Sequence, residues 1–308
     1  MVSVDKLEDK MKHVNKTLII AEIGINFAFG KSQADFMDNV KKLIDAAVAA
    51  GCDYVKFQKR NPEDCIPKAE WNKAKQVPWR AEETTYLQYK KDIELWDREF
   101  DQIDEYCREK GILWFASVWD KASCDFMRQY HTKLPNGKIG VMIKIPSALI
   151  NDLDLVLYAK ESSDFLLIST GMSTQREIDD AISVGEPDVV FHTNSTYPSP
   201  VEELNLDYIT YLQHIRCEFI KAYTVGYSGH EFGLSTTVAA NMLGAEWIER
   251  HLTLDRTLWG SDQMASVEPA GMVKLVKSIR DIECARGGYG ARKVLASEKA
   301  KRKTLRGK

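Results

Sequence analysis

The stretch Leu18-Ile19-Ile20-Ala21-Glu22-Ile23-Gly24 is a short apolar run, and a helical pattern follows it over residues 36–50 until Gly51. A continuously apolar run of this length predicts a strand buried on both faces, as in parallel sheets. Glycine directly after the last periodic residue is typical of a helix C-terminus. The stretch therefore predicts one strand–helix unit, and the fold depends on how often this unit recurs.

The same alternation recurs along the chain. Seven further strand-like runs cover residues 54–58, 113–117, 141–145, 165–169, 189–192, 223–227 and 246–248. Helix-like segments follow most of them, at residues 100–109, 122–130, 153–160, 175–184, 206–214, 235–243 and 271–284. Eight apolar strands alternating with helices predict a (β/α)8 TIM barrel of the α/β class rather than an open doubly wound sheet.

This pattern divides the chain into three parts. Residues 1–16 are expected to be a charged leader, residues 17–290 the catalytic barrel, and residues 291–308 a basic, solvated tail. One long interruption, residues 59–97, separates the second strand from its helix. Structureless loops of that length are usually functional. The segment is either a lid over the strand ends or a packed excursion that stabilises the barrel.

Composition narrows the class of partner. The 42 Lys and Arg residues nearly balance the 45 Asp and Glu residues, which favours a small-molecule ligand over nucleic acid or an anionic membrane. No apolar stretch reaches the roughly 18 residues of a membrane helix, so a cytoplasmic location is expected. The six cysteines form no Cys-x-x-Cys pair, which favours free thiols.

Polar side chains close nearly every predicted strand, and in a barrel these positions surround the active site. They are Glu22, Lys56, Gln58, Ser117, Lys144, Ser147, Ser169, Thr170, Ser195, Tyr197, Ser228, His230, Glu249 and His251. Lys56 and Lys144 are costly to bury without an anion, so they predict an anionic ligand. The serine hydroxyls at neighbouring strand ends would complete a cradle for a phosphate or a carboxylate.

His230 and His251 end two neighbouring strands, so their side chains can converge. Neutral imidazoles suit Mn²⁺, Fe²⁺ or Zn²⁺, and two histidines leave coordination positions open for water and substrate. The alternative is a pair of buried histidines that only bond to their neighbours.

At these residues the sequence resembles the sialic acid synthase family, whose members condense phosphoenolpyruvate with an N-acylated amino sugar. The signatures are Ala21-Glu22-Ile23-Gly24-Ile25-Asn26, Val55-Lys56-Phe57-Gln58, Lys144-Ile145-Pro146-Ser147, Ser169-Thr170-Gly171-Met172-Ser173, residues 192–198, Gly226-Tyr227-Ser228-Gly229-His230, Glu249-Arg250-His251-Leu252-Thr253-Leu254-Asp255 and Gly260-Ser261-Asp262.

The resemblance implies a transferase that forms a carbon–carbon bond and releases phosphate. It implies a phosphoenolpyruvate site at Lys56, Ser117, Lys144, Ser147, Ser169, Ser195, Tyr197 and Ser228. His230 and His251 would hold a catalytic Mn²⁺, and Glu22 and Asp262 would contact the metal-bound water or the sugar. N-acetylmannosamine or a related N-acyl amino sugar would be the acceptor, and a nonulosonic acid the product.

The chain departs from the family pattern in three ways. It reads Phe27-Ala28-Phe29-Gly30 where the family has a His-Asn-Gly sequence, and it has Gly229 where the family has Asp. The resemblance also covers the barrel without the family's C-terminal antifreeze-like domain. A homodimer, or a separate chain that supplies this domain, is expected on that basis.

Two other functions are open. A 3-deoxy-aldulosonate phosphate synthase would share the barrel and the donor, but it needs basic residues for the acceptor's phosphate. Arg80 is the one candidate for that role. A barrel that has lost catalysis and binds only an anion, as the partner of another enzyme, is the second alternative.

Overall fold

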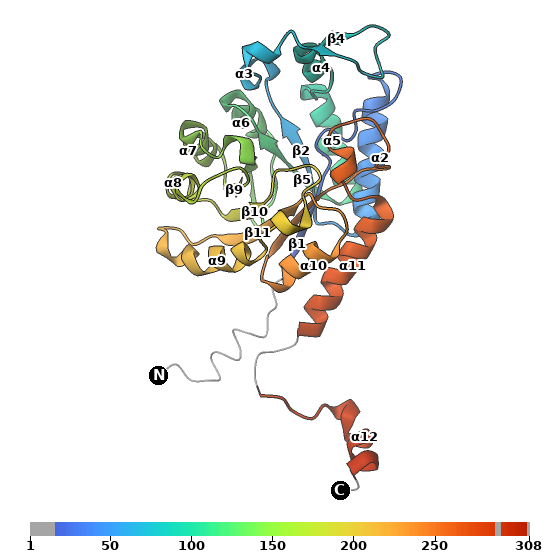
Figure 1. The fold of residues 1–308 in the computed structure, drawn as a ribbon, viewed down its shortest axis with the longest axis vertical. Coiled ribbons are helices and arrows are strands. Elements are labelled where there is room, and N and C mark those ends of the chain that lie inside the picture. Colours follow the sequence, from blue (N-terminus) through green and yellow to red (C-terminus); the bar gives the residue numbers. More distant parts are fainter. Residues whose placement is uncertain (1–15, 287–290, 307–308) are drawn as a thin grey trace.

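The computed structural model describes residues 16–286 and 291–306, and its centre is a closed ring of eight parallel strands (Figure 1). In chain order the strands are β1 (Leu18–Glu22), β2 (Tyr54–Lys59), β5 (Leu113–Val118), β8 (Met142–Ile145), β9 (Phe165–Ser169), β10 (Val189–Thr193), β11 (Thr224–Gly229) and β12 (Trp247–His251). The ring closes because β1 pairs with both β2 and β12. The predicted (β/α)8 barrel is confirmed.

A helix follows each strand and covers the outside of the ring. These helices are α2 (Asp35–Ala50), α5 (Asp97–Lys110), α6 (Lys121–Met127), α7 (Leu153–Ser162), α8 (Gln175–Gly185), α9 (Asp207–Ile215), α10 (Ser235–Met242) and α11 (Pro269–Arg286). Gly51 ends α2 with φ of 81°, a left-handed conformation that glycine adopts without steric cost.

Two apolar clusters hold the barrel. The larger lies between strands and helices and includes Val55, Ile143 and Leu275. The smaller includes Tyr54, Phe115, Phe191 and Trp247 and fills the interior of the ring. Because apolar side chains fill the ring below the strand ends, the polar side chains that point into the ring gather at the carboxyl ends of the strands.

Strand register places these polar residues side by side. Glu22 is opposite both Lys56 on β2 and His251 on β12. Ser117 on β5 is opposite Lys144 on β8. The same level of the ring continues with Ser228 opposite Glu249. Closure of the barrel therefore brings residues that are distant in sequence onto one rim.

The long segment between β2 and α5 is folded, so the expectation of a structureless loop is wrong. It contains α3 (Pro62–Cys65), the 3-10 turn η1 (Lys68–Glu70), the antiparallel pair β3 (Ala74–Lys75) and β4 (Thr84–Thr85), and α4 (Tyr86–Asp92). The sequence lacked a signal because these elements are short and are held by aromatic contacts. Trp79 packs edge-on against Phe36 of α2, with ring centroids 5.1 Å apart.

The remaining elements are peripheral. A second antiparallel pair is β6 (Thr132–Lys133) with β7 (Ile139–Gly140). The basic segment near the C-terminus forms α12 (Ala296–Arg306), which has no buried residue and lies apart from the barrel (Figure 1). Within the described residues, no helix is both long and apolar enough to cross a membrane. All six cysteines are free thiols, as expected.

Candidate active site

A cavity of about 210 Å³ opens at the carboxyl ends of the strands. Eleven of the twelve predicted site residues line it: Glu22, Lys56, Ser117, Lys144, Ser147, Ser169, Ser195, Tyr197, Ser228, His230 and His251. Its volume is below the range of about 300–1,000 Å³ that drug-sized ligands occupy. A compact polar ligand therefore suits it better than a large one.

Two lysines and two glutamates form an ion-pair network on one wall. Lys56 Nζ lies 2.6 Å from Glu22 Oε2 and 3.8 Å from Glu249 Oε1, and it donates to Ser117 Oγ at 2.7 Å. Lys144 Nζ donates to both carboxylate oxygens of Glu249 at 2.8 Å. Burial of the lysines therefore does not by itself require a ligand, because the chain supplies both anions.

The network sets the charge of each group. Burial raises the pKa of the Glu22 carboxyl above its usual value, although Lys56 opposes the change. Burial also acts to raise the pKa of Glu249, but the two ammonium groups outweigh it and the pKa falls below its usual value. Burial lowers the pKa of Lys144 to about 8 despite Glu249. Glu249 is thus the firm anion, and Glu22 is the carboxyl that can exchange a proton near neutral pH.

His230 and His251 lie side by side in the lining of the cavity, with ring centroids 5.3 Å apart. His230 Nδ1 donates to the carbonyl of Asn194 at 2.6 Å, which leaves the lone pair on Nε2. His251 Nδ1 is buried without a hydrogen-bond partner. Burial lowers the pKa of both imidazoles to about 3, so both are neutral at pH 7.

Hydroxyl groups, among them those of Ser147 and Ser195, form a second wall of the cavity. The Gly171 backbone N–H donates to Ser147 Oγ at 3.1 Å. A Cβ on residue 171 would lie 2.9 Å from Ser147 Oγ and closer still to Ser195 Oγ. A side chain at this position would displace the two hydroxyls, which converge on a buried stretch of backbone. Such a concave set of donors suits an oxyanion.

Asp262 is the one predicted residue that does not line the cavity. It lies behind His251, with Oδ2 3.8 Å from His251 Nδ1. Tyr197 lines the cavity mouth instead, and its ring centroid is 4.1 Å from that of His230. Asp262 is therefore near His251 but makes no hydrogen bond to it, and Tyr197 covers the two imidazoles.

A second ion pair holds the histidines from outside the barrel wall. Glu231 follows His230 and Arg250 precedes His251, and both are almost fully buried. Arg250 Nη1 donates to Glu231 Oε1 at 3.2 Å and to Thr237 Oγ1 at 2.6 Å. Because side chains alternate across a strand, this pair fixes β11 and β12 on the face opposite the cavity.

Two departures from the resemblance have local causes. A side chain at Gly229 would collide with the Glu231 carboxylate, since its Cβ would lie 2.6 Å from Oε2. Phe27 is buried and packs on Phe36 with ring centroids 5.8 Å apart. Phe36 in turn packs against Trp79 of the long segment. Phe27 therefore supports the long segment through Phe36, and none of residues 27–29 lines the cavity.

Sequence reasoning missed two features. Glu249 was seen as a strand-end residue but not as the shared counter-ion of both lysines. The Glu231–Arg250 pair was not identified at all. The sequence contained an indication of both features. Glu249 is a charged residue within an apolar strand, and Glu231 and Arg250 are each adjacent to a predicted metal ligand.

The carboxyl-end cavity, with ionisable groups from most strands around it, defines a (β/α)8-barrel enzyme. The NeuB family model matches residues 43–290, and the chain belongs to this family.

Relatives of known name agree with the family. The chain is 31% identical to N,N'-diacetyllegionaminic acid synthase of Campylobacter jejuni over 92% of this chain and 81% of that protein. It is 32% identical to human N-acetylneuraminate-9-phosphate synthase over 87% of this chain and 71% of that protein. The crystal structure of N-acetylneuraminic acid synthetase from Leptospira borgpetersenii, in complex with citrate, superposes with a TM-score of 0.75 at 28% identity, covering 96% and 94% of the two chains. This chain is accordingly a synthase.

Proposed function

We propose that this synthase condenses phosphoenolpyruvate with N-acetylmannosamine or a related N-acyl amino sugar, and gives a nonulosonic acid and phosphate. The observation that carries the proposal is the cavity itself, which holds two lysines, converging hydroxyls and two neutral imidazoles at one end of the barrel. In the reaction, C3 of the donor bonds to the sugar's aldehyde carbon and water adds at C2. The bond between C2 and the oxygen that bridges to phosphorus then breaks, and phosphate leaves.

The lysine wall and the hydroxyl wall are assigned to the donor. Phosphoenolpyruvate carries a carboxylate and a phosphate, so it needs cations and several hydrogen-bond donors. Lys56 and Lys144 supply the cations. The Ser147 hydroxyl, which accepts from the Gly171 N–H, and the Ser195 hydroxyl supply a concave donor set. Glu249 keeps both ammonium groups in place before the donor arrives.

The histidine pair is assigned to a divalent metal, with Mn²⁺ as the expected ion. The fit rests on His251 Nδ1, which is buried without a partner, and on the Asn194 carbonyl that leaves His230 Nε2 free. The described residues hold no group of three or more His, Cys, Asp or Glu side chains suited to an ion, so these two imidazoles would be its protein ligands. When bound, such an ion supplies Lewis-acid polarisation of a carbonyl oxygen.

Glu22 is assigned to proton transfer. Its pKa is raised by burial, which moves the carboxyl toward the range where a group can both take and return a proton. Gln58 Nε2 donates to Glu22 Oε1 at 3.1 Å, and Lys56 holds the other oxygen. These contacts fix the carboxyl at the rim, where the water that adds at C2 would give up its proton.

The structure weakens the 3-deoxy-aldulosonate phosphate alternative. Arg80, its candidate for the acceptor's phosphate, is engaged by Asp92, which lies 2.6 Å from Arg80 Nη2. That arginine is not free to hold a substrate.

The test is donor consumption with a panel of acceptors. Purified protein with Mn²⁺ is mixed with phosphoenolpyruvate and N-acyl hexosamines, and products are identified by mass spectrometry. We expect donor loss only with metal and a suitable sugar, and a product whose mass equals donor plus sugar plus water minus phosphoric acid. Binding of metal and donor without turnover on any sugar would instead support a barrel that has lost catalysis.

A further inference from the structure

A second cavity, of about 290 Å³, lies on the outer face of β11 and β12, on the side of these strands opposite the histidine pair. We call it the outer pocket. Its walls are residues 231–234 after β11, Arg250 of β12, Arg256, and residues 266–274 around the start of α11. None of its lining residues also lines the cavity at the strand ends, so the two cavities are separate.

The start of α11 presents unbonded donors to the outer pocket. Ala270 and Gly271, in the first turn of this helix, line the pocket, and neither backbone N–H has a hydrogen-bond partner among the described residues. The first turn contains no acidic residue that would balance the partial positive charge at this end of the helix. Lys274 lies one turn further on the same face and is exposed. It has no ion pair with a carboxylate of residues 16–286 or 291–306.

The start of α10 adjoins the same pocket but already has an anion. The Glu231 carboxylate accepts from the hydroxyls of Thr236 and Thr237 in the first turn of α10, each at 2.8 Å. Glu268, directly before α11, instead turns its carboxylate toward Arg256. It accepts from the Arg256 backbone N–H at 3.3 Å and lies 3.5 Å from the guanidinium. The chain thus places an anion on the first turn of α10 and none on the first turn of α11.

The side chain of Arg250 independently indicates a missing ligand. Only 2% of Arg250 is exposed, and it lines the outer pocket. Its two Nη atoms donate to Glu231, Gly233 and Thr237, whereas its Nε is buried without a partner. A buried donor without an acceptor costs free energy, and an anion in the pocket would reduce that cost.

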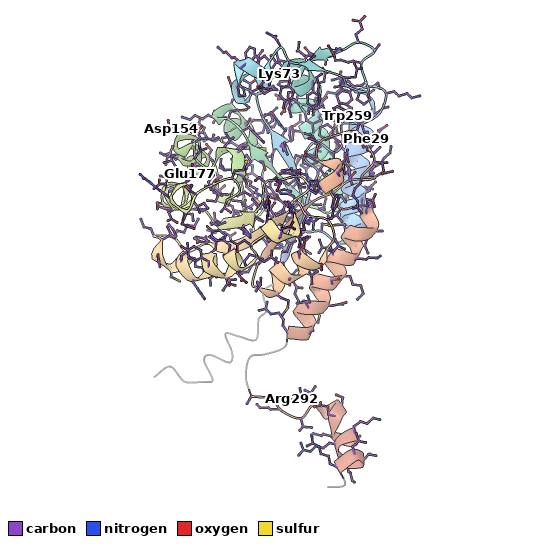
Figure 2. All side chains as sticks on the ribbon, in the orientation of Figure 1. Phe29, Lys73, Asp154, Glu177, Trp259 and Arg292 are labelled. Atoms are coloured by element: carbon purple, nitrogen blue, oxygen red, sulfur yellow. The ribbon has the colours of Figure 1, made fainter. Side chains whose placement is uncertain are left out.

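The charges that line the pocket leave a positive surplus. Its two glutamates are each paired with an arginine, Glu231 with Arg250 and Glu268 with Arg256. Lys274 and the start of α11 remain without a counter-charge. The basic C-terminal segment contributes nothing here, since Figure 2 shows Arg292 away from the barrel.

We propose that the outer pocket binds a phosphate group, held by the start of α11, Lys274 and Arg250. Phosphate carries several acceptor oxygens and a negative charge, which suit free N–H groups at a helix N-terminus beside an ammonium group. The ligand is free phosphate or a phosphate ester, because half-exposed Phe232 gives an organic group a ring to pack on. This inference does not depend on the proposed condensation.

Hydrogen exchange followed by mass spectrometry tests the proposal and distinguishes the two cavities. Inorganic phosphate or phenyl phosphate is titrated into the purified protein, with sodium chloride as the control for ionic strength. We expect both phosphates to slow exchange saturably in peptides covering residues 266–276, because the free N–H groups of Ala270 and Gly271 would become hydrogen-bonded. Peptides covering residues 141–149 report separately on the cavity at the strand ends. Tighter binding of phenyl phosphate at residues 266–276 would assign the site to an ester, and equal binding would assign it to the free ion.

Two substitutions at exposed positions complete the test. Lys274→Met should raise the phosphate concentration needed for half-maximal protection by about tenfold. Lys277→Met is its matched control, since Lys277 lies in the same helix, is exposed and pairs with Asp281, and it should behave as the wild type. Ala270→Glu places a carboxylate at the start of α11, so it should abolish the protection by phosphate and raise the urea midpoint without any ligand.

Two results would overturn the proposal. One is the absence of phosphate protection at residues 266–276 in the wild type. The other is wild-type protection in both Lys274→Met and Ala270→Glu, which would place the bound phosphate elsewhere. Either result would leave the condensation standing, because the outer pocket shares no lining residue with the cavity at the strand ends.

Discussion

Strands β11 and β12 carry buried polar residues on both faces, and the two faces differ in how completely those residues are bonded. On the outer face, the Glu231 carboxylate accepts from Tyr227, Thr236, Thr237 and Arg250. On the inner face, His251 Nδ1 has no partner, and the two imidazoles lie side by side. On the outer face the Glu231 carboxylate is fully bonded and Arg250 Nε alone of the pair lacks a partner, whereas the inner set is open toward the cavity.

This difference separates stability from function. A buried charge with saturated hydrogen bonds can hold two strands together, and removing one partner exposes the full desolvation cost of the other. A buried polar atom without a partner is a cost to the fold, and where the atom adjoins a cavity a ligand can remove that cost. Substitutions on the inner face should therefore lower activity more than stability, and substitutions on the outer face should do the reverse.

His251→Ala is the largest expected effect on the inner face. Loss of one imidazole removes half of the protein's hold on the metal, so kcat/KM for condensation should fall by about three orders of magnitude or more. Stability should change by no more than about 1 kcal/mol, because the imidazole lines a cavity and His251 Nδ1 makes no hydrogen bond. Steady-state kinetics and urea unfolding measure the two quantities. Turnover at the wild-type rate would show that the histidine pair is structural.

Arg250→Met is the largest expected effect on the outer face. It leaves Glu231 buried beside three hydroxyls without its counter-ion, which should cost about 3–5 kcal/mol in the free energy of unfolding. Arg256→Met is the matched control, since Arg256 pairs with Glu268 on the surface at 3.5 Å and should cost at most about 1 kcal/mol.

The double variant Glu231→Leu with Arg250→Met completes this test. It removes both charges, so it should recover much of the stability lost by Arg250→Met alone. Urea unfolding of the wild type, both single variants and the double variant gives the coupling energy. A coupling near zero would mean that the outer pair does not hold the strands.

The inner face could be predicted from sequence because a barrel makes strand ends equivalent. In a barrel of eight parallel strands, the carboxyl ends of all strands lie at the same rim. The polar residue at each of these ends is therefore expected at that rim, whatever its position along the chain. Lys56, Lys144 and His251 were found in this way, and the structure brings them together. Asp262 was placed by resemblance alone, and it lies outside the ring of lining residues.

The outer face and the long segment could not be predicted in the same way. Glu231 and Arg250 are each next to a predicted metal ligand. The sequence does not show that these two residues form an ion pair on the outer face of the barrel. The sequence of the long segment shows no hydrophobic periodicity. Its short elements are held by contacts of Trp79, Tyr89 and Trp259 rather than by an amphipathic face. Pairing of this kind depends on tertiary contacts, which leave no local pattern.

Lys144→Met should have a smaller effect than either substitution above, and it tests the donor assignment. One charge-assisted contact to phosphoenolpyruvate is lost, worth about 1.5–3 kcal/mol, so its dissociation constant should rise roughly 10- to 150-fold. Glu249 keeps Lys56 as a neighbour at 3.8 Å, which limits the cost to the fold. Titration calorimetry with the donor measures the change. An unchanged constant would remove Lys144 from the donor site.

The smallest expected effect is a difference in pH dependence that isolates the outer pair. Burial acts to raise the pKa of Glu231, but Arg250 and the hydrogen bonds to its oxygens outweigh this, and the pKa lies below the usual 4.5. Above about pH 4.5 the carboxylate is ionised in both the folded and the unfolded chain, and the pair contributes fully. As the pH falls below that value, the unfolded chain takes up the proton first, so unfolding becomes easier. Urea unfolding at about pH 7 and about pH 4 should therefore show a larger loss of stability in the wild type than in the double variant of Glu231 and Arg250. Equal losses would mean that other carboxylates, and not the outer pair, cause the acid sensitivity of the barrel.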